Sequence, residues 1–148
     1  MKLTFPALLA CALAACATHR PETQRFVPIG EDMESWGELE FSNQSLSFAN
    51  RQGEMKLKYV GQMPDTAGEE LAGASVYRVE NANSYFTANR NTEGFCSEPP
   101  RWAVINSPAG APAWSGEIRV SLLTVEDWTR FEPGMQGHCA GSKYVRAN

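Results

Sequence analysis

The chain has 148 residues, of which 43% are hydrophobic and 20% charged, and its formal net charge at pH 7 is −4. This length allows one domain with its own hydrophobic core and leaves little room for a second domain. The acidic balance argues against nucleic acid as a partner, because phosphate binding requires clustered lysine and arginine.

The first 16 residues have the pattern of a bacterial export signal. Lys2 precedes an apolar run over residues 3–13, and two small residues, Ala14 and Ala15, lead directly to Cys16. The apolar run is shorter than the roughly 20 residues of a membrane-spanning helix, which argues against an uncleaved anchor. The stretch Leu13-Ala14-Ala15-Cys16 resembles the lipobox of bacterial lipoproteins.

That resemblance implies that residues 1–15 are a signal peptide and that Cys16 becomes the lipidated N-terminus, carrying acyl chains such as palmitate. Cys11 would be removed with the signal. Ala17 stands where aspartate usually retains lipoproteins in the inner membrane of Gram-negative bacteria. The resemblance therefore implies an outer-membrane lipoprotein facing the periplasm, if the source is Gram-negative, with the lipid on Cys16 as its link to the membrane.

Residues 16–25 are mostly polar and show no apolar periodicity, so we expect a lipidated tether followed by one β domain over residues 26–148. Residues 26–29 predict a strand, and Pro28 suggests that it lies at a sheet edge. Residues 36–41, 45–48 and 54–59 alternate apolar and polar side chains, which is the period of a strand. The short turns between these three segments predict an antiparallel meander, because a parallel crossover needs a dozen or more residues.

The rest of the chain continues the strand pattern with longer interruptions. Residues 62–73 predict an acidic loop with one helical turn at 69–71, and residues 75–79 and 85–87 predict a hairpin. Further strands are expected over 102–105, 117–122 and 143–146. Residues 124–127 fit a helix-capping box, so a single helical turn at 128–130 is expected, with a strand-exit loop as the alternative.

About eight short strands with almost no helical period predict an all-β fold, a small antiparallel barrel or sandwich with an N-terminal meander. Eight strands enclose an interior that side chains can fill or that can hold one small ligand. The fold class alone therefore does not separate a carrier from a domain with a filled core.

Two cysteines, Cys96 and Cys139, remain in the β domain. Export to an oxidising compartment predicts a disulfide between them, whose loop closure is worth roughly 4 kcal/mol on the chain-entropy estimate. The alternatives are a metal site that includes His138 or a reactive thiol. A metal site is disfavoured because it needs three or four ligands, and the chain has only two histidines.

The common catalytic motifs are missing, so we expect neither an enzyme nor a cofactor or metal. The sequence contains no phosphate-binding glycine loop, no H-E-x-x-H, no G-x-S-x-G and no C-x-x-C. His138 is the only histidine in the β domain and is interpreted as a core or loop residue. Paired acids such as Glu69 and Glu70 are interpreted as solvated.

The tryptophans are the remaining candidates for a binding surface, because a large ring with one polar edge suits ligand contact. The candidates are Trp36, Trp102, Trp114 and Trp128. Core packing is the alternative for Trp36 and Trp102, which lie in strand patterns. Trp114 lies among proline, alanine and glycine, and is the best candidate for an exposed contact residue.

The β domain resembles small β-rich envelope lipoproteins, on the basis of residues 36–59, Phe95-Cys96 and residues 139–144. It shares its size, anchor and β content with META-domain proteins and C-type lysozyme inhibitor lipoproteins, but the inhibitor motifs are not found. The resemblance implies a lipid-anchored, non-catalytic domain that binds a protein or another envelope component. The alternatives are a lipocalin-like carrier of a small apolar ligand and a lysozyme-inhibitor-like protein.

Three geometries distinguish these functions. A wide aromatic-lined cavity favours the carrier, and a filled barrel with an exposed apolar patch favours the interaction module. A loop that presents His138 or a carboxylate to a cleft suits an inhibitor or a hydrolase.

Overall fold

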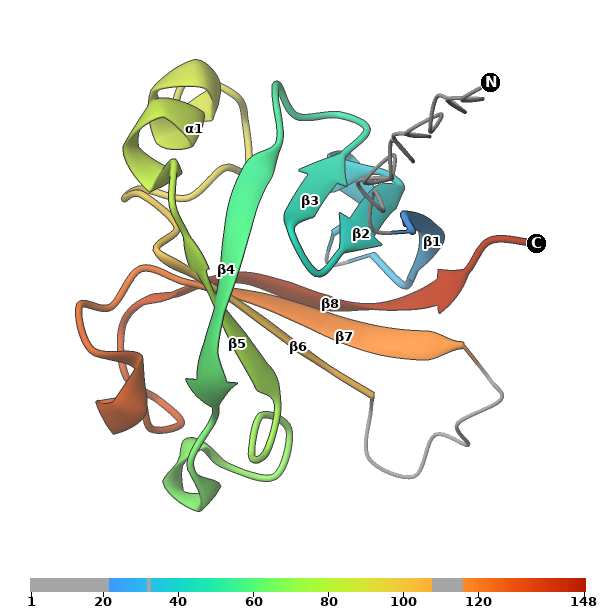
Figure 1. The fold of residues 1–148 in the computed structure, drawn as a ribbon. Helices are drawn as coiled ribbons and strands as arrows, with labels where there is room; N and C mark the ends of the chain where they lie inside the picture. The colour runs from blue at the N-terminus through green and yellow to red at the C-terminus, as the bar shows by residue number, and fades with distance from the viewer. Residues whose placement is uncertain (1–21, 32, 108–115) are drawn as a thin grey trace, which may run out of the picture.

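The computed structural model of the chain describes residues 22–31, 33–107 and 116–148. In this part of the chain, eight strands form a closed antiparallel barrel in which each strand pairs with its neighbours in chain order, and the last strand pairs with the first (Figure 1). The strands are β1 (Gln24–Ile29), β2 (Leu39–Ser42), β3 (Ser45–Phe48), β4 (Met55–Gln62), β5 (Ser75–Val79), β6 (Trp102–Asn106), β7 (Glu117–Leu123) and β8 (His138–Arg146). The predicted all-β class and antiparallel barrel are confirmed.

Short helical elements lie between the strands. They are the α-helix α1 (Ala82–Asn89) and the 3-10 turns η1 (Glu34–Trp36), η2 (Asp65–Ala67) and η4 (Trp128–Arg130). The predicted meander is present as β2, β3 and β4, with Leu39 opposite Phe48 and Leu46 opposite Met55. Across the described ranges, no helix is both long and apolar enough to cross a lipid bilayer.

The predicted hairpin over residues 75–87 is wrong, because its second arm is helix α1. Strand β5 ends just before Asn81, whose side chain accepts a hydrogen bond from Lys56 N–H and donates one to Glu54 C=O. Strand β5 instead pairs with β6, and Tyr85 of the helix is buried against Phe95. Tertiary packing thus overrides the β propensity of the tyrosine and phenylalanine in this segment.

Other predicted boundaries differ from the structure by a few residues. Trp36 ends the 3-10 turn η1, because Gly37 adopts a φ of +76° and the strand starts only at Leu39. The helical turn of the acidic loop is η2, earlier than the predicted 69–71. The turn at 128–130 is present as η4, and Asp127 accepts its capping hydrogen bond from Thr129 N–H.

Strand β1 begins at Gln24, so it includes the last two residues of the segment assigned to the tether. It is not an edge strand, because residues 24–26 pair with β2 and residues 26–29 pair with β8. Pro28 nevertheless lies in the half that pairs on one side only. A proline fits there, because it has no N–H to donate to a second neighbour.

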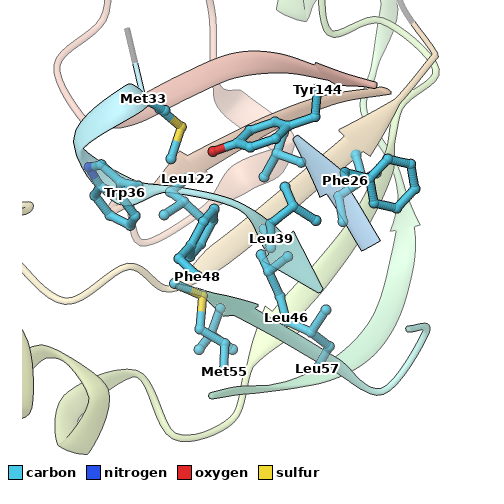
Figure 2. Close-up of a cluster of buried hydrophobic side chains, with 14 of the residues drawn as sticks. Phe26, Met33, Trp36, Leu39, Leu46, Phe48, Met55, Leu57, Leu122 and Tyr144 are labelled. Carbon is cyan, nitrogen blue, oxygen red and sulfur yellow. The ribbon is translucent and has the colours of Figure 1, made fainter. Parts of the chain in front are cut away.

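Alternating side chains from the strands fill the barrel interior, and we call this cluster the inner core (Figure 2). It contains Phe26, Met33, Trp36, Leu39, Leu46, Phe48, Met55, Leu57, Val79, Tyr85, Cys96, Ala103, Ile105, Val120, Leu122 and Tyr144. Each of these residues is at most 8% exposed. Large apolar side chains therefore occupy the space inside the barrel.

One end of the inner core is covered by a cap from three separate loops. The Arg51 guanidinium lies 4.6 Å from the ring centre of Trp36, and that ring stacks on Phe95 at 5.3 Å. The predicted disulfide between Cys96 and Cys139 is formed and ties this cap to strand β8. The disulfide therefore joins the middle of the chain to the last strand.

A second hydrophobic cluster, which we call the outer core, lies on the opposite face of three of these strands, β5, β6 and β7. It contains Met63, Ala67, Leu71, Ala74, Val76, Val104, Leu123 and Phe131. Adjacent residues of one strand face the two clusters, because side chains alternate across a sheet. On β7, for example, Leu122 belongs to the inner core and Leu123 to the outer core.

Candidate functional site

The outer core is covered by two loops, residues 63–74 between β4 and β5 and residues 124–137 between β7 and β8. The loops meet where Gly68 approaches Pro133, since a Cβ at Gly68 would lie 2.6 Å from the proline Cγ. Gly68 also has a φ of +91°, in the left-handed region that glycine adopts readily. The contact holds two segments, more than 50 residues apart, on one face of the barrel.

Between these loops lies an open cleft of about 420 Å³. It is lined by Ala67, Gly68, Glu69, Glu70, Leu71, Ser121, Phe131, Pro133, Gly134, Met135 and His138. The walls come mainly from the apolar side chains of the two loops, whereas Ser121 and His138 come from the barrel strands. An apolar pocket with a few polar groups at one side is the usual form of a binding site.

The polar part of the cleft depends on Gly141 of β8, which lies opposite Ser121 of β7. A Cβ at Gly141 would lie 2.7 Å from His138 Nε2 and 3.0 Å from Ser121 Oγ. Only the missing side chain allows the imidazole to lie over the strand beside the serine. Gly141 therefore positions both polar groups of the cleft.

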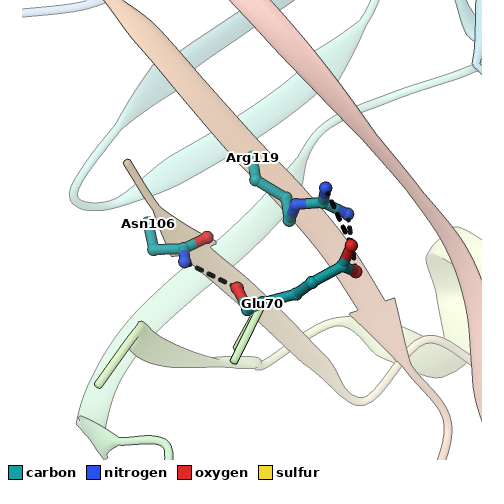
Figure 3. A network of polar contacts seen from close by, with 3 residues as sticks. All are labelled: Glu70, Asn106 and Arg119. Atoms are coloured by element: carbon teal, nitrogen blue, oxygen red, sulfur yellow. Dashed lines mark hydrogen bonds and ion pairs between the residues drawn. The ribbon is translucent and has the colours of Figure 1, made fainter. Parts of the chain in front are cut away.

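An ion pair closes one side of the cleft. Arg119 of β7 donates from Nη1 to Glu70 Oε2 at 3.1 Å and from Nη2 to Glu70 Oε1 at 3.4 Å, and Asn106 Nδ2 donates to the Glu70 carbonyl at 2.8 Å (Figure 3). The Glu70 side chain is 72% exposed, so we expect the pair to add less than about 1 kcal/mol to stability. Its main effect is to fix the tip of loop 63–74 against the barrel.

The environment of His138 lowers the pKa of its imidazole below the ordinary value. Partial desolvation is the largest cause, even though the residue as a whole is exposed, and the Arg119 charge is the second. The Glu70 carboxylate opposes both effects. At neutral pH the ring is therefore neutral, so it can donate one hydrogen bond and accept another.

The structure separates the tryptophans proposed as a binding surface. Trp36 is 2% exposed in the inner core, where its Nε1 donates to Gly94 C=O at 3.2 Å. Trp102 and Trp128 are partly buried beside the outer core, with ring centres 6.3 Å apart. None of these three lines the cleft. Trp114 and Cys16 lie outside the described residues.

Sequence reasoning did not find the cleft, because its walls come from two distant loops and its floor from two strands. The sequence indicates a core or loop residue at His138 and a solvated acid at Glu70, and the Glu70 side chain is indeed 72% exposed. Neither interpretation could anticipate that both would lie beside Arg119. The separate glycines at positions 134, 137 and 141 are a local sign that the backbone is closely approached in this region.

No group of three or more His, Cys, Asp or Glu side chains in residues 22–31, 33–107 and 116–148 is placed to hold a metal ion. Comparison with protein-family models, curated proteins and solved structures finds no match for this chain. The interpretation of the site therefore depends on its own geometry. That geometry offers apolar contact along the loops, and hydrogen bonds at the strand side.

Proposed function

We propose that this chain is a lipid-anchored protein of the cell envelope whose barrel binds another envelope component without catalysis, through the cleft between loops 63–74 and 124–137. The observation that carries the proposal is the cleft itself, with apolar walls and the hydrogen-bonding groups of His138 and Ser121 at its floor. The filled inner core supports an external site, because large side chains already occupy the interior.

The cleft is suited to binding because its walls are held in place before a partner arrives. Gly68 packs on Pro133, and Glu70 is joined to Arg119 and Asn106. Pre-organised walls reduce the conformational entropy that is lost on binding. Met135 is 46% exposed at this site, which provides a flexible apolar contact for a partner surface.

Crosslinking in intact cells tests the proposed site. A photoreactive amino acid is placed at Met135 in the cleft, and a matched control is placed at the exposed Thr87 of α1. We expect a discrete adduct of higher mass from position 135, weakened when Leu71→Ala removes part of the wall. Equal adducts from both positions, or none from position 135, would contradict the proposal.

The proposed lipid anchor is inferred from the lipobox pattern, and a second cysteine in the chain provides a control for its test. Cys16→Ser should remove the acyl mass and shift the protein from the detergent phase to the aqueous phase. Cys11→Ser, five residues earlier in the expected signal peptide, should leave both properties unchanged. An unmodified Cys16 in the wild-type protein would contradict the anchor while leaving the cleft proposal open to its own test.

The lipocalin-like carrier is a second candidate, supported by the barrel fold and the apolar walls of the cleft. Native mass spectrometry of the purified protein distinguishes it from a partner-binding domain. A small molecule that stays bound in the native spectrum and is released on denaturation would favour the carrier. A bare chain that gives the crosslinked adduct would favour the partner-binding domain.

A further inference from the structure

Strand β4 is longer than the strand beside it. It has eight residues, whereas β3 has four, and the register between them contains only Ser45 opposite Lys56 and Leu46 opposite Met55. The last backbone hydrogen bond between β4 and the β2–β3 hairpin runs from Leu57 N–H to Gln44 C=O at 2.9 Å. Figure 1 shows β4 continuing beyond the level at which the β2–β3 hairpin ends.

Residues 58–62 of β4 therefore have a strand neighbour on one side only. They pair with β5, and no strand among the described residues pairs with them on the β3 side. Backbone groups alternate in direction along a strand, so the Tyr59 N–H and C=O point to the same side as those of Leu57. At Leu57 this side is occupied by Gln44, whereas at Tyr59 no strand of the described residues lies there. An exposed row of such groups is a template for another strand.

The inner face of this free edge carries one exposed aromatic ring, Tyr59, beside two rings that are partly buried against the inner core. Tyr59 is 54% exposed, and its ring centre lies 5.7 Å from that of Tyr77. The ring centre of Tyr77 in turn lies 5.9 Å from that of Phe41 of β2, so the three rings form a row that ends at the inner core. The row provides an apolar surface on which inward side chains of an added strand would pack.

The outer face of the same edge is positively charged. Lys58 lies directly opposite Arg78 of β5, and both side chains are exposed. Like charges in this position repel one another, and within the described part of the chain neither side chain has an ion pair or a hydrogen bond. Acidic side chains on a neighbouring strand would compensate both charges.

We propose that residues 58–62 of β4 bind an extended peptide segment of a partner protein as an additional strand. The segment has apolar residues on the side that faces Tyr59 and Tyr77, and aspartate or glutamate on the side that faces Lys58. Main-chain hydrogen bonds to the free edge supply affinity, and the alternation of apolar and acidic side chains along the segment supplies specificity. This surface is separate from the cleft, so either site can be tested without the other.

The probe is a fluorescent seven-residue peptide that alternates valine and glutamate, titrated against the purified protein by anisotropy. We expect saturable binding, with the Tyr59 amide becoming protected from hydrogen exchange. A peptide with lysine in place of glutamate should bind at least about fivefold more weakly. A peptide that is N-methylated at every residue has no N–H group on either edge, so it cannot pair as a strand and should not bind. Equal binding of the N-methylated peptide would overturn the proposal.

Two substitutions on one strand separate local pairing from general charge attraction. Lys58→Glu should weaken binding of the acidic peptide about fivefold, because it reverses the charge beside the free edge. Lys56→Glu makes the same change on the same face, two residues away, where Ser45 of β3 already occupies the neighbouring position. Equal weakening by the two variants would overturn strand addition at residues 58–62.

Two further outcomes identify a different occupant and would also overturn the proposal. A Tyr59 amide that is already protected in the free monomer would show that the chain fills its own edge. A dimer in analytical ultracentrifugation that dissociates with Lys58→Glu would assign the edge to a second copy. A monomer with an unprotected Tyr59 amide that binds the acidic peptide supports the proposal.

Discussion

The inner and outer cores share one sheet but are built in different ways. Every strand contributes to the inner core, so closing the barrel and forming this core are the same event. The outer core combines one face of three strands with two loops that lie against it. The difference indicates that the inner core determines whether the protein folds, whereas the outer core determines the shape of the candidate site.

The sharpest test of this difference uses two adjacent leucines of β7, both of which are 0% exposed. Leu122→Ala opens a cavity inside the closed barrel and should reduce the free energy of unfolding by about 4 kcal/mol. Leu123→Ala faces loops that can partly collapse, so we expect a loss of about 2 kcal/mol. Urea denaturation measures both values. Equal losses would show that the loops do not collapse into the cavity at Leu123, and would contradict the difference between the two cores.

The disulfide tests how far the cap depends on the barrel. Replacing both cysteines, with Cys96→Ala and Cys139→Ala, should reduce the free energy of unfolding by about 4 kcal/mol, because the closed loop spans a sequence separation of 43 residues. Since Cys96 belongs to the inner core, hydrogen exchange should increase around Trp36 and Phe95 first. Faster exchange confined to loop 63–74 would contradict this expectation.

The ion pair on the outer core should have a smaller effect. Glu70→Gln removes the paired charge of Arg119, and we expect a loss of about 0.5 kcal/mol together with faster hydrogen exchange in loop 63–74. Glu69→Gln is the matched control, because no ion pair of Glu69 is found in the described ranges. If both variants exchange at the same rate, the ion pair does not hold the loop.

The smallest expected effect is a pH dependence from His138, whose pKa in the folded state is lowered from an ordinary value of 6.5. The unfolded chain then takes up the proton at a higher pH than the folded protein does. The contribution of the neutral ring is therefore complete above pH 6.5 and is lost as the pH falls below it. His138→Gln should flatten the stability profile in this window, whereas His19→Gln, which changes the only other histidine, should not.

Much of the inner core could be predicted from the sequence, because it depends on local alternation. Leu39, Leu46 and Leu57 belong to three short segments in which every second side chain is apolar. The turns between these segments are so short that only an antiparallel arrangement is possible. The disulfide was predictable for a different reason, because the β domain contains only two cysteines. Predicting these features does not require knowing which distant segments of the chain are in contact.

The outer core and the cleft could not be predicted in this way. The contact of Gly68 with Pro133 joins loops whose own sequences are irregular, and neither loop has a periodicity that indicates its partner. The position of His138 depends on the missing side chain of Gly141, three residues later. Helix α1 was missed because the burial of Tyr85 against Phe95, rather than local propensity, determines its structure.

The pairing of β1 with β8 has a consequence for the time course of folding. Val27 lies opposite Val145, so the barrel wall is completed by residues from the two ends of the domain. Contacts between such distant positions form late, because the entropy of closing the whole chain must be lost first. During synthesis the barrel cannot close until the last strand has left the ribosome. The nascent chain therefore has no closed barrel until residues 138–146 have been made, and its inner core stays incomplete for the whole of that time.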